Sequence, residues 1–123
     1  MKRILFLLLL LSSCYSVERN CVDFKTGVFE FSTSINDSIV TSTFTRTDKY
    51  EIESFNGVKD SSIIKWVNEC EFLLTKIRPK TNQEKRPIRI KILRTYGDQY
   101  DFEFSAVNNP DKIIRGTVKR VSD

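Results

Sequence analysis

The sequence contains no histidine, and glycine, proline and cysteine number only four, three and three in 123 residues. Without histidine, the usual Ser–His and Cys–His nucleophile pairs cannot be built. The glycines are too widely spaced for a phosphate-binding loop: they are Gly27, Gly57, Gly97 and Gly116. A zinc site is not expected either, because zinc sites draw on histidine or on Cys-x-x-Cys pairs. The composition predicts a protein that is not an enzyme and that carries no metal or cofactor.

Long apolar runs are also missing. The longest covers residues 4–11, far short of the roughly 20 apolar residues that cross a bilayer. This run follows Lys2 and Arg3 and precedes two serines, an order typical of a secretory signal. We therefore predict that residues 1–13 are a signal peptide.

Cys14 ends the string Leu11-Ser12-Ser13-Cys14, which resembles the lipobox of bacterial lipoproteins. In such proteins the thiol carries a lipid, and two or three acyl chains anchor stably because each buried methylene contributes about 0.8 kcal/mol. The alternatives are cleavage without lipidation and a cysteine placed there by chance. We expect a lipid on Cys14, a tether over residues 14–22 and a β domain over residues 23–123. Neither an inner-membrane retention signal nor an acid-rich run follows Cys14, so the expected location is the outer membrane, facing the periplasm.

The charge of the mature chain is close to neutral. Removing residues 1–13 takes away Lys2 and Arg3, which leaves 18 basic and 16 acidic residues and a net charge of +2. So small a charge gives no electrostatic reason to expect nucleic acid as a partner. The expected partner is the membrane, through the lipid anchor, with an envelope protein or lipopolysaccharide as a further candidate.

With Cys14 lipidated, Cys21 and Cys70 remain as a pair. An oxidising compartment favours a disulfide between them. This bridge would close a loop of about 50 residues and stabilise the fold by roughly 4 kcal/mol in the loop-entropy model. The alternative is two buried free thiols that lie too far apart to bridge.

After the tether, apolar and polar residues alternate with a period of two, and turn residues recur at regular intervals. The pattern predicts eight strands, over residues 26–33, 37–46, 49–56, 61–67, 70–78, 87–96, 99–107 and 112–121. Short antiparallel strands favour an all-β meander rolled into a small, lipocalin-like barrel or half-barrel, because closure removes unpaired edges. A two-sheet sandwich would produce a similar pattern.

The two strands around Gly97 have the clearest predicted register. If paired residue numbers sum to 194, one face is apolar, with Ile88 opposite Ala106, Ile90 opposite Phe104 and Ile92 opposite Phe102. On the other face Lys91 lies opposite Glu103, and Arg94 lies diagonal to Asp101. Both faces therefore agree on one register. The next turn is predicted over residues 108–111.

Two surfaces are candidates for contact with a partner. Ile63, Val67, Leu73 and Ile77 occupy the second face of strands whose first face is also apolar. This pattern indicates either a second core layer or an exposed partner surface. A basic segment follows, and it would either contact anionic headgroups and lipopolysaccharide phosphates or form a solvated loop; its cations are Lys76, Arg78, Lys80, Lys85 and Arg86.

Two carboxylate pairs have the spacing that places both members on one strand face: Glu51 with Glu53, and Asp101 with Glu103. Such pairs can serve acid–base chemistry. We interpret them instead as parts of solvated outer faces, balanced by neighbouring cations. Arg46 is a strand-borne cation for which the sequence suggests no partner.

Eight aromatic residues of the predicted strands would either fill the core or line an apolar cavity. They are Phe29, Phe31, Phe44, Phe55, Trp66, Phe72, Phe102 and Phe104. The leading interpretation of the chain is a non-enzymatic, membrane-anchored envelope lipoprotein with a binding or structural β domain. The alternative is a lipocalin-like carrier of a small apolar ligand.

Three strings carry a resemblance to a family. They are the Cys-x-x-Phe-x-Thr-Gly-x-Phe opening at residues 21–29, the Trp-x-x-x-Cys-x-Phe pattern at residues 66–72, and Thr45-Arg46-Thr47-Asp48 between them. Together they resemble a group of small, uncharacterised lipoproteins from Bacteroidota, over essentially the whole mature chain. The resemblance implies a shared fold and location, and no known activity.

Members of that group often carry the label DNA topoisomerase IV. Type II topoisomerases need a tyrosine nucleophile, metal-binding carboxylates and an ATPase domain on a far longer chain. Tyr50, Tyr96 and Tyr100 lie in strands or at a turn, without a glycine loop to hold phosphate. An exported protein would not meet the chromosome, so we interpret the label as inherited in error.

Overall fold

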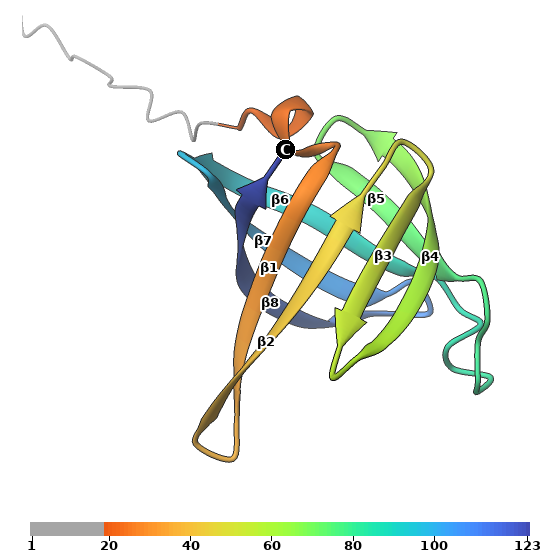
Figure 1. The fold of residues 1–123 in the computed structure, drawn as a ribbon. Helices are drawn as coiled ribbons and strands as arrows, with labels where there is room; N and C mark the ends of the chain where they lie inside the picture. Colours follow the sequence, from red (N-terminus) through yellow and green to blue (C-terminus); the bar gives the residue numbers. More distant parts are fainter. Residues whose placement is uncertain (1–18) are drawn as a thin grey trace, which may run out of the picture.

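The computed structural model describes residues 19–123, which form one closed barrel of eight antiparallel strands (Figure 1). In chain order the strands are β1 (Gly27–Ile35), β2 (Ser38–Arg46), β3 (Tyr50–Phe55), β4 (Val58–Asn68), β5 (Glu71–Lys76), β6 (Ile88–Tyr96), β7 (Gln99–Ala106) and β8 (Asn109–Ser122). Each strand pairs with the next, and β8 returns to pair with β1. The predicted all-β meander is confirmed, and the barrel is closed. Among residues 19–123, no helix has the length and hydrophobicity needed to cross a membrane.

The β6–β7 hairpin follows the predicted register over its apolar face and at Lys91, which lies opposite Glu103. The register then shifts by one residue between Ile92 and Arg94. Because of this bulge, Arg94 lies directly opposite Asp101 instead of diagonal to it, and the two side chains form an ion pair of 3.0 Å. A β-bulge adds one residue to one strand, which an alternation pattern does not reveal.

The predicted four-residue turn at 108–111 is wrong. Ala106 pairs with Asn109, so the turn is shorter and Pro110 belongs to β8. A second register shift, between Phe104 and Ala106, accompanies this tight turn. Proline is tolerated near the start of a strand, where the ladder does not need its missing N–H.

A short 3-10 helix, η1 (Cys21–Phe24), lies over one end of the barrel (Figure 1). Cys21 and Phe24 are buried, and the predicted disulfide between Cys21 and Cys70 is present, with Cα atoms 5.2 Å apart. Arg120 of β8 donates hydrogen bonds to the carbonyl groups of Asp23 and Thr26. Residue 21, which the sequence assigned to the tether, is therefore part of the core. The predicted signal peptide and Cys14 lie outside the described residues.

The half of the barrel next to η1, the closed half, is filled with side chains. Phe29, Phe72, Ile92 and Tyr100 are almost fully buried there. Phe24 of η1 adds to this packing, with its ring 5.2 Å from that of Tyr100 in an edge-to-face arrangement. The other half, the open half, ends at the β3–β4 and β7–β8 turns and the loop between β5 and β6 (Figure 1).

Candidate functional site

The open half of the barrel contains a cavity of about 660 Å³, which we call the cup. This volume lies within the range of about 300–1,000 Å³ that is usual for small-molecule sites. One wall of the cup is apolar and comes from β5 to β8: it consists of Leu74, Ile88, Phe104, Ala106 and Ile114. Ile114 is 48% exposed although it pairs with inward-facing Phe104, because its side chain borders empty space.

The opposite wall is polar and comes from β3 and β4. Glu51 and Glu53 are in phase along β3, and their cross-strand partners on β4 are Ser62 and Asp60. All four side chains line the cup. The interpretation of Glu51 and Glu53 as part of a solvated outer face is therefore wrong. Alternation alone did not reveal this, because the inner face of the barrel is apolar in the closed half and polar in this wall.

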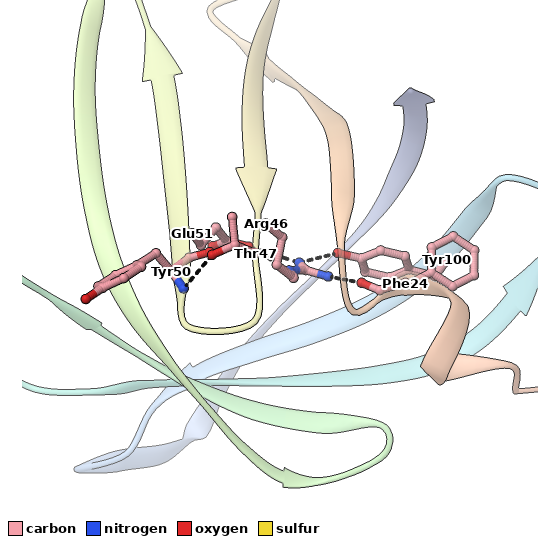
Figure 2. Close-up of polar contacts among 6 residues, drawn as sticks. All are labelled: Phe24, Arg46, Thr47, Tyr50, Glu51 and Tyr100. Carbon is pink, nitrogen blue, oxygen red and sulfur yellow. Dashed lines mark hydrogen bonds and ion pairs between the residues drawn. The ribbon is translucent and has the colours of Figure 1, made fainter. Parts of the chain in front are cut away.

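Glu51 forms the floor of the cup, and Arg46 lies behind it, only 2% exposed and not itself lining the cavity. Figure 2 shows the polar contacts of Arg46. Its Nη2 donates to Glu51 Oε1 at 2.9 Å and to the Tyr100 hydroxyl at 2.9 Å. Its Nη1 donates to the carbonyl of Phe24 at 2.7 Å, which ties the floor to η1. Both contacts between Arg46 and Glu51 end on Oε1, since Nε also donates to that oxygen at 3.2 Å.

Aromatic rings enclose the guanidinium group of Arg46. Its central carbon lies 4.7 Å from the centroid of Phe72, 4.9 Å from that of Phe29 and 5.3 Å from that of Phe44. Ring faces attract a cation, and the attraction is larger where water is excluded. The sequence offered one signal for this cluster: Arg46 is in phase with Phe44 on β2 and lies across a tight turn from Glu51.

The charges at the floor perturb each other. Burial raises the pKa of the Glu51 carboxyl, and Arg46 opposes this effect without cancelling it. The neighbouring Glu53 raises the pKa of Glu51 further. Burial works against the charge of Arg46, but Tyr100 and Glu51 outweigh it, so the pKa of Arg46 is raised and the guanidinium stays charged.

At the mouth of the cup, Lys76 is held between two carboxylates. Its Nζ lies 2.9 Å from Asp60 on β4 and 2.9 Å from Glu84 in the β5–β6 loop. Two hydrogen bonds within the loop hold Glu84 in place. Its carboxylate accepts from the Lys80 N–H, and its own N–H donates to Thr81 Oγ1. These contacts fix one side of the entrance.

The predicted basic segment therefore does not act as one surface. Lys76 is engaged inside the mouth, and Arg86 lines the cup. Arg78, Lys80 and Lys85 are exposed on the loop. Contact of these cations with anionic headgroups stays a prediction.

The predicted apolar surface lies on the outer side of β4 and β5 and at the residue that follows β5. Ile63, Val67 and Ile77 are 50%, 54% and 45% exposed, and Leu73 is partly buried. The described residues form no second core layer over this face. Whether a partner covers it stays a prediction.

The second carboxylate pair does lie on the outer face, as interpreted. Asp101 pairs with Arg94, and Glu103 lies 3.5 Å from Arg115. Within residues 19–123, no cluster of three or more His, Cys, Asp or Glu side chains is arranged to hold a metal ion.

Comparison of the chain with protein-family models, curated proteins and solved structures finds no match. The function is therefore inferred from the geometry of the cup.

Proposed function

We propose that this protein is a membrane-anchored, non-enzymatic barrel that binds a small amphiphilic molecule in the cup. One observation carries the proposal: the two halves of the same barrel are packed differently. The closed half buries its inward side chains almost completely, whereas inward apolar side chains of the open half, such as Ile114, remain accessible. Covering apolar surface contributes about 25 cal/mol per Å², so a ligand with an apolar part is favoured there.

The lining supports an amphiphile over a purely apolar ligand. Leu74, Ile88 and Phe104 form an apolar wall, while Glu53 and Ser62 on the opposite wall offer polar contacts. Binding sites commonly combine a mostly apolar lining with a few polar groups that orient the ligand. The anchor in this proposal is the lipid expected on Cys14.

A second candidate function is docking of an envelope protein on the outer face of β4 and β5. The observation that favours it is the exposure of Ile63 and Val67 on β4 and of Ile77, which directly follows β5. Clusters of exposed apolar residues commonly mark interaction surfaces. The cup and this face lie on opposite sides of the same strands, so the two functions can be tested separately.

Calorimetric titration with decanol tests the cup. Ser62 lies on its inner wall, so Ser62→Phe fills the cavity, whereas Ser61→Phe places the same side chain on the outer face of β4. We expect decanol to bind the unmodified chain and the Ser61→Phe control, and binding to be lost in Ser62→Phe. Absence of binding to the unmodified chain, or equal binding to both variants, would contradict the proposal.

A further inference from the structure

The β3–β4 hairpin reverses the usual polarity of a barrel wall. The three carboxylates of its strands line the cup and therefore point inward: Glu51, Glu53 and Asp60. Successive side chains of a strand point to opposite faces, so the residues next to these carboxylates point outward. Among the outward residues, Tyr50, Ile52 and Ile63 are exposed. This wall thus presents apolar side chains to its surroundings and carboxylates to the cavity.

The exposed apolar residues are neighbours in the strand register. Tyr50 lies directly opposite Ile63. Ile52 lies opposite Ser61, whose carbonyl accepts a hydrogen bond of 3.0 Å from the Ile77 N–H. The two rows are two residues apart along β4, which is about 7 Å. We call the surface that they share with their outward neighbours the outer apolar face; its residues are Tyr50, Ile52, Ile63, Val67, Leu73 and Ile77.

Cations border the outer apolar face. Lys59 and Lys65 are exposed on β4, before and after Ile63. The β5–β6 loop begins at Ile77 and exposes further cations directly beside it. Among the described residues, none of five bordering cations takes part in an ion pair: Lys59, Lys65, Arg78, Lys80 and Lys85. These charges are therefore free to meet anionic groups of a partner.

Few carboxylates accompany these cations. Glu71 is the outward carboxylate of β5, and Arg89 on β6 pairs with it at 3.5 Å. Asp48 and Glu69 are exposed in turns at the closed end of the barrel, where Lys49 follows Asp48. The surroundings of the outer apolar face therefore carry an excess of positive charge.

The disulfide places the beginning of the domain beside this face. It holds Cys21 of η1 against Cys70 in the β4–β5 turn, with Cα atoms 5.2 Å apart. Cys14, the expected lipid site, precedes Cys21 by seven residues, which span at most about 25 Å. A lipid on Cys14 would therefore keep the outer apolar face close to the bilayer.

A lipid surface and a protein can be compared as partners of this face. A leaflet with anionic phospholipids offers an apolar boundary to the isoleucines and phosphates to the cations. Tyrosine suits this boundary, because its ring is apolar and its hydroxyl is polar. A protein partner would have to supply carboxylates at matching positions around its own apolar patch. The free cations and the expected anchor favour the leaflet.

We propose that the outer apolar face lies against an anionic phospholipid leaflet, with its isoleucines at the headgroup boundary and the bordering cations on the phosphates. This inference goes beyond the proposed function, because the contact does not depend on what the cup binds. It assigns to a lipid surface the face that was considered above for an envelope protein.

Quenching of tryptophan fluorescence by brominated lipids measures contact with the bilayer. Ile63→Trp places the probe on the outer apolar face, and Ile113→Trp is the matched control on the outer face of β8, since the two isoleucines are 50% and 47% exposed. Each full-length variant is reconstituted into vesicles of phosphatidylglycerol and phosphatidylcholine. We expect brominated chains to reduce the emission of Ile63→Trp and to leave that of Ile113→Trp at the level given by Trp66, which both variants share.

The contribution of the cations is tested in the Ile63→Trp background. Each cation near an anionic surface strengthens the contact by about fivefold, so Lys65→Gln should reduce the quenching. Lys119→Gln makes the same charge change on the outer face of β8 and should leave it unchanged. Vesicles of phosphatidylcholine alone should also reduce it. Circular dichroism establishes that each variant is folded, and Tyr50→Trp provides a second probe on the same face.

The outcomes decide between the partners. Equal quenching at residues 63 and 113, or none at residue 63, would overturn the proposal and leave the face to a protein partner. Quenching that neither Lys65→Gln nor neutral lipid reduces would also overturn it, because the cations would then not select the surface. Decanol binding by the same variants tests the cup separately, so failure of this inference leaves the proposed function standing.

Discussion

At the scale of single residues, Arg46 lies where the two halves of the barrel meet. It is a buried cation whose contacts reach η1 through the Phe24 carbonyl, β3 through Glu51 and β7 through Tyr100. A buried charge is costly unless its partners replace water, and here a carboxylate, a hydroxyl, a carbonyl and aromatic ring faces do so. Arg46 therefore separates the packed aromatic half from the open cup.

Replacing Arg46 by methionine should lower the free energy of unfolding by about 3–5 kcal/mol, because it leaves the buried carboxylate of Glu51 without its counter-charge. The double variant Arg46→Met, Glu51→Leu should be more stable than Arg46→Met alone, since it removes both charges. Urea unfolding of the two single variants and the double variant measures the coupling. If the two single effects simply add, the ion pair is not the reason for the loss.

Asp101 gives a residue-scale prediction about pH. Partial burial raises its pKa, but Oδ1 accepts hydrogen bonds of 2.8 Å from Thr117 and from Tyr96, and these lower it. Pairing with Arg94 also lowers it, and the net pKa of Asp101 lies below its ordinary value.

Because the folded-state pKa is lowered, the unfolded chain takes up a proton at Asp101 first as the pH falls, and the stability gained at neutral pH is lost below about pH 4. We expect Asp101→Asn to be less stable than the unmodified chain at pH 7 and to lose less stability between pH 5 and pH 2. Thermal unfolding across this range measures both effects. An identical pH slope in the two proteins would contradict the assignment.

At the scale of elements, η1 is a lid on the closed half. It is a single short 3-10 helix, so its position depends on what fixes it: the Cys21–Cys70 disulfide, the buried Phe24 ring and the hydrogen bonds from Arg120. The disulfide links this lid to the β4–β5 turn, 49 residues away in sequence.

Replacing both Cys21 and Cys70 by alanine should cost about 4 kcal/mol of stability in the loop-entropy model. The loss should be accompanied by faster hydrogen exchange in η1, whereas decanol binding at the opposite end should persist at a temperature where the variant is folded. Loss of binding in a folded variant would show that the cup depends on the lid.

At the element scale, the strands could be predicted from the sequence, but the β-bulges within them could not. Period-two alternation located all eight strands, because a barrel has one apolar and one polar face along most of each strand. The bulges near Leu93 and Ser105 were missed, since an extra residue leaves the residue types unchanged. The inward position of Glu51 and Glu53 was missed for a different reason: the β3–β4 wall of the cup is polar, so its residues do not follow the apolar-inside rule.

At the scale of the whole molecule, the barrel is closed and packed at one end and hollow at the other. Strand pairing around the complete circle leaves no unpaired edge, so the open half keeps its shape without a filled interior. Stability and binding are thus assigned to different halves of one sheet.

The expected lipid anchor gives a whole-molecule prediction. Cys14→Ser removes the thiol that would carry the lipid, so we expect the expressed protein to leave the membrane fraction or to remain uncleaved. Immunoblots of membrane and soluble fractions compare it with the unmodified chain. Unchanged membrane association of a cleaved Cys14→Ser chain would rule out the anchor.

The central claim is that the open half of the barrel binds an amphiphile, and isoleucine methyl NMR tests it most directly. Ile88 and Ile114 line the cup, whereas Ile63, Ile77 and Ile113 are exposed and do not line it. Titration with decylamine should shift the methyl signals of Ile88 and Ile114 in a saturable manner and leave the other three in place. Saturable shifts confined to Ile63 and Ile77, or no shift at the two cup residues, would contradict the account.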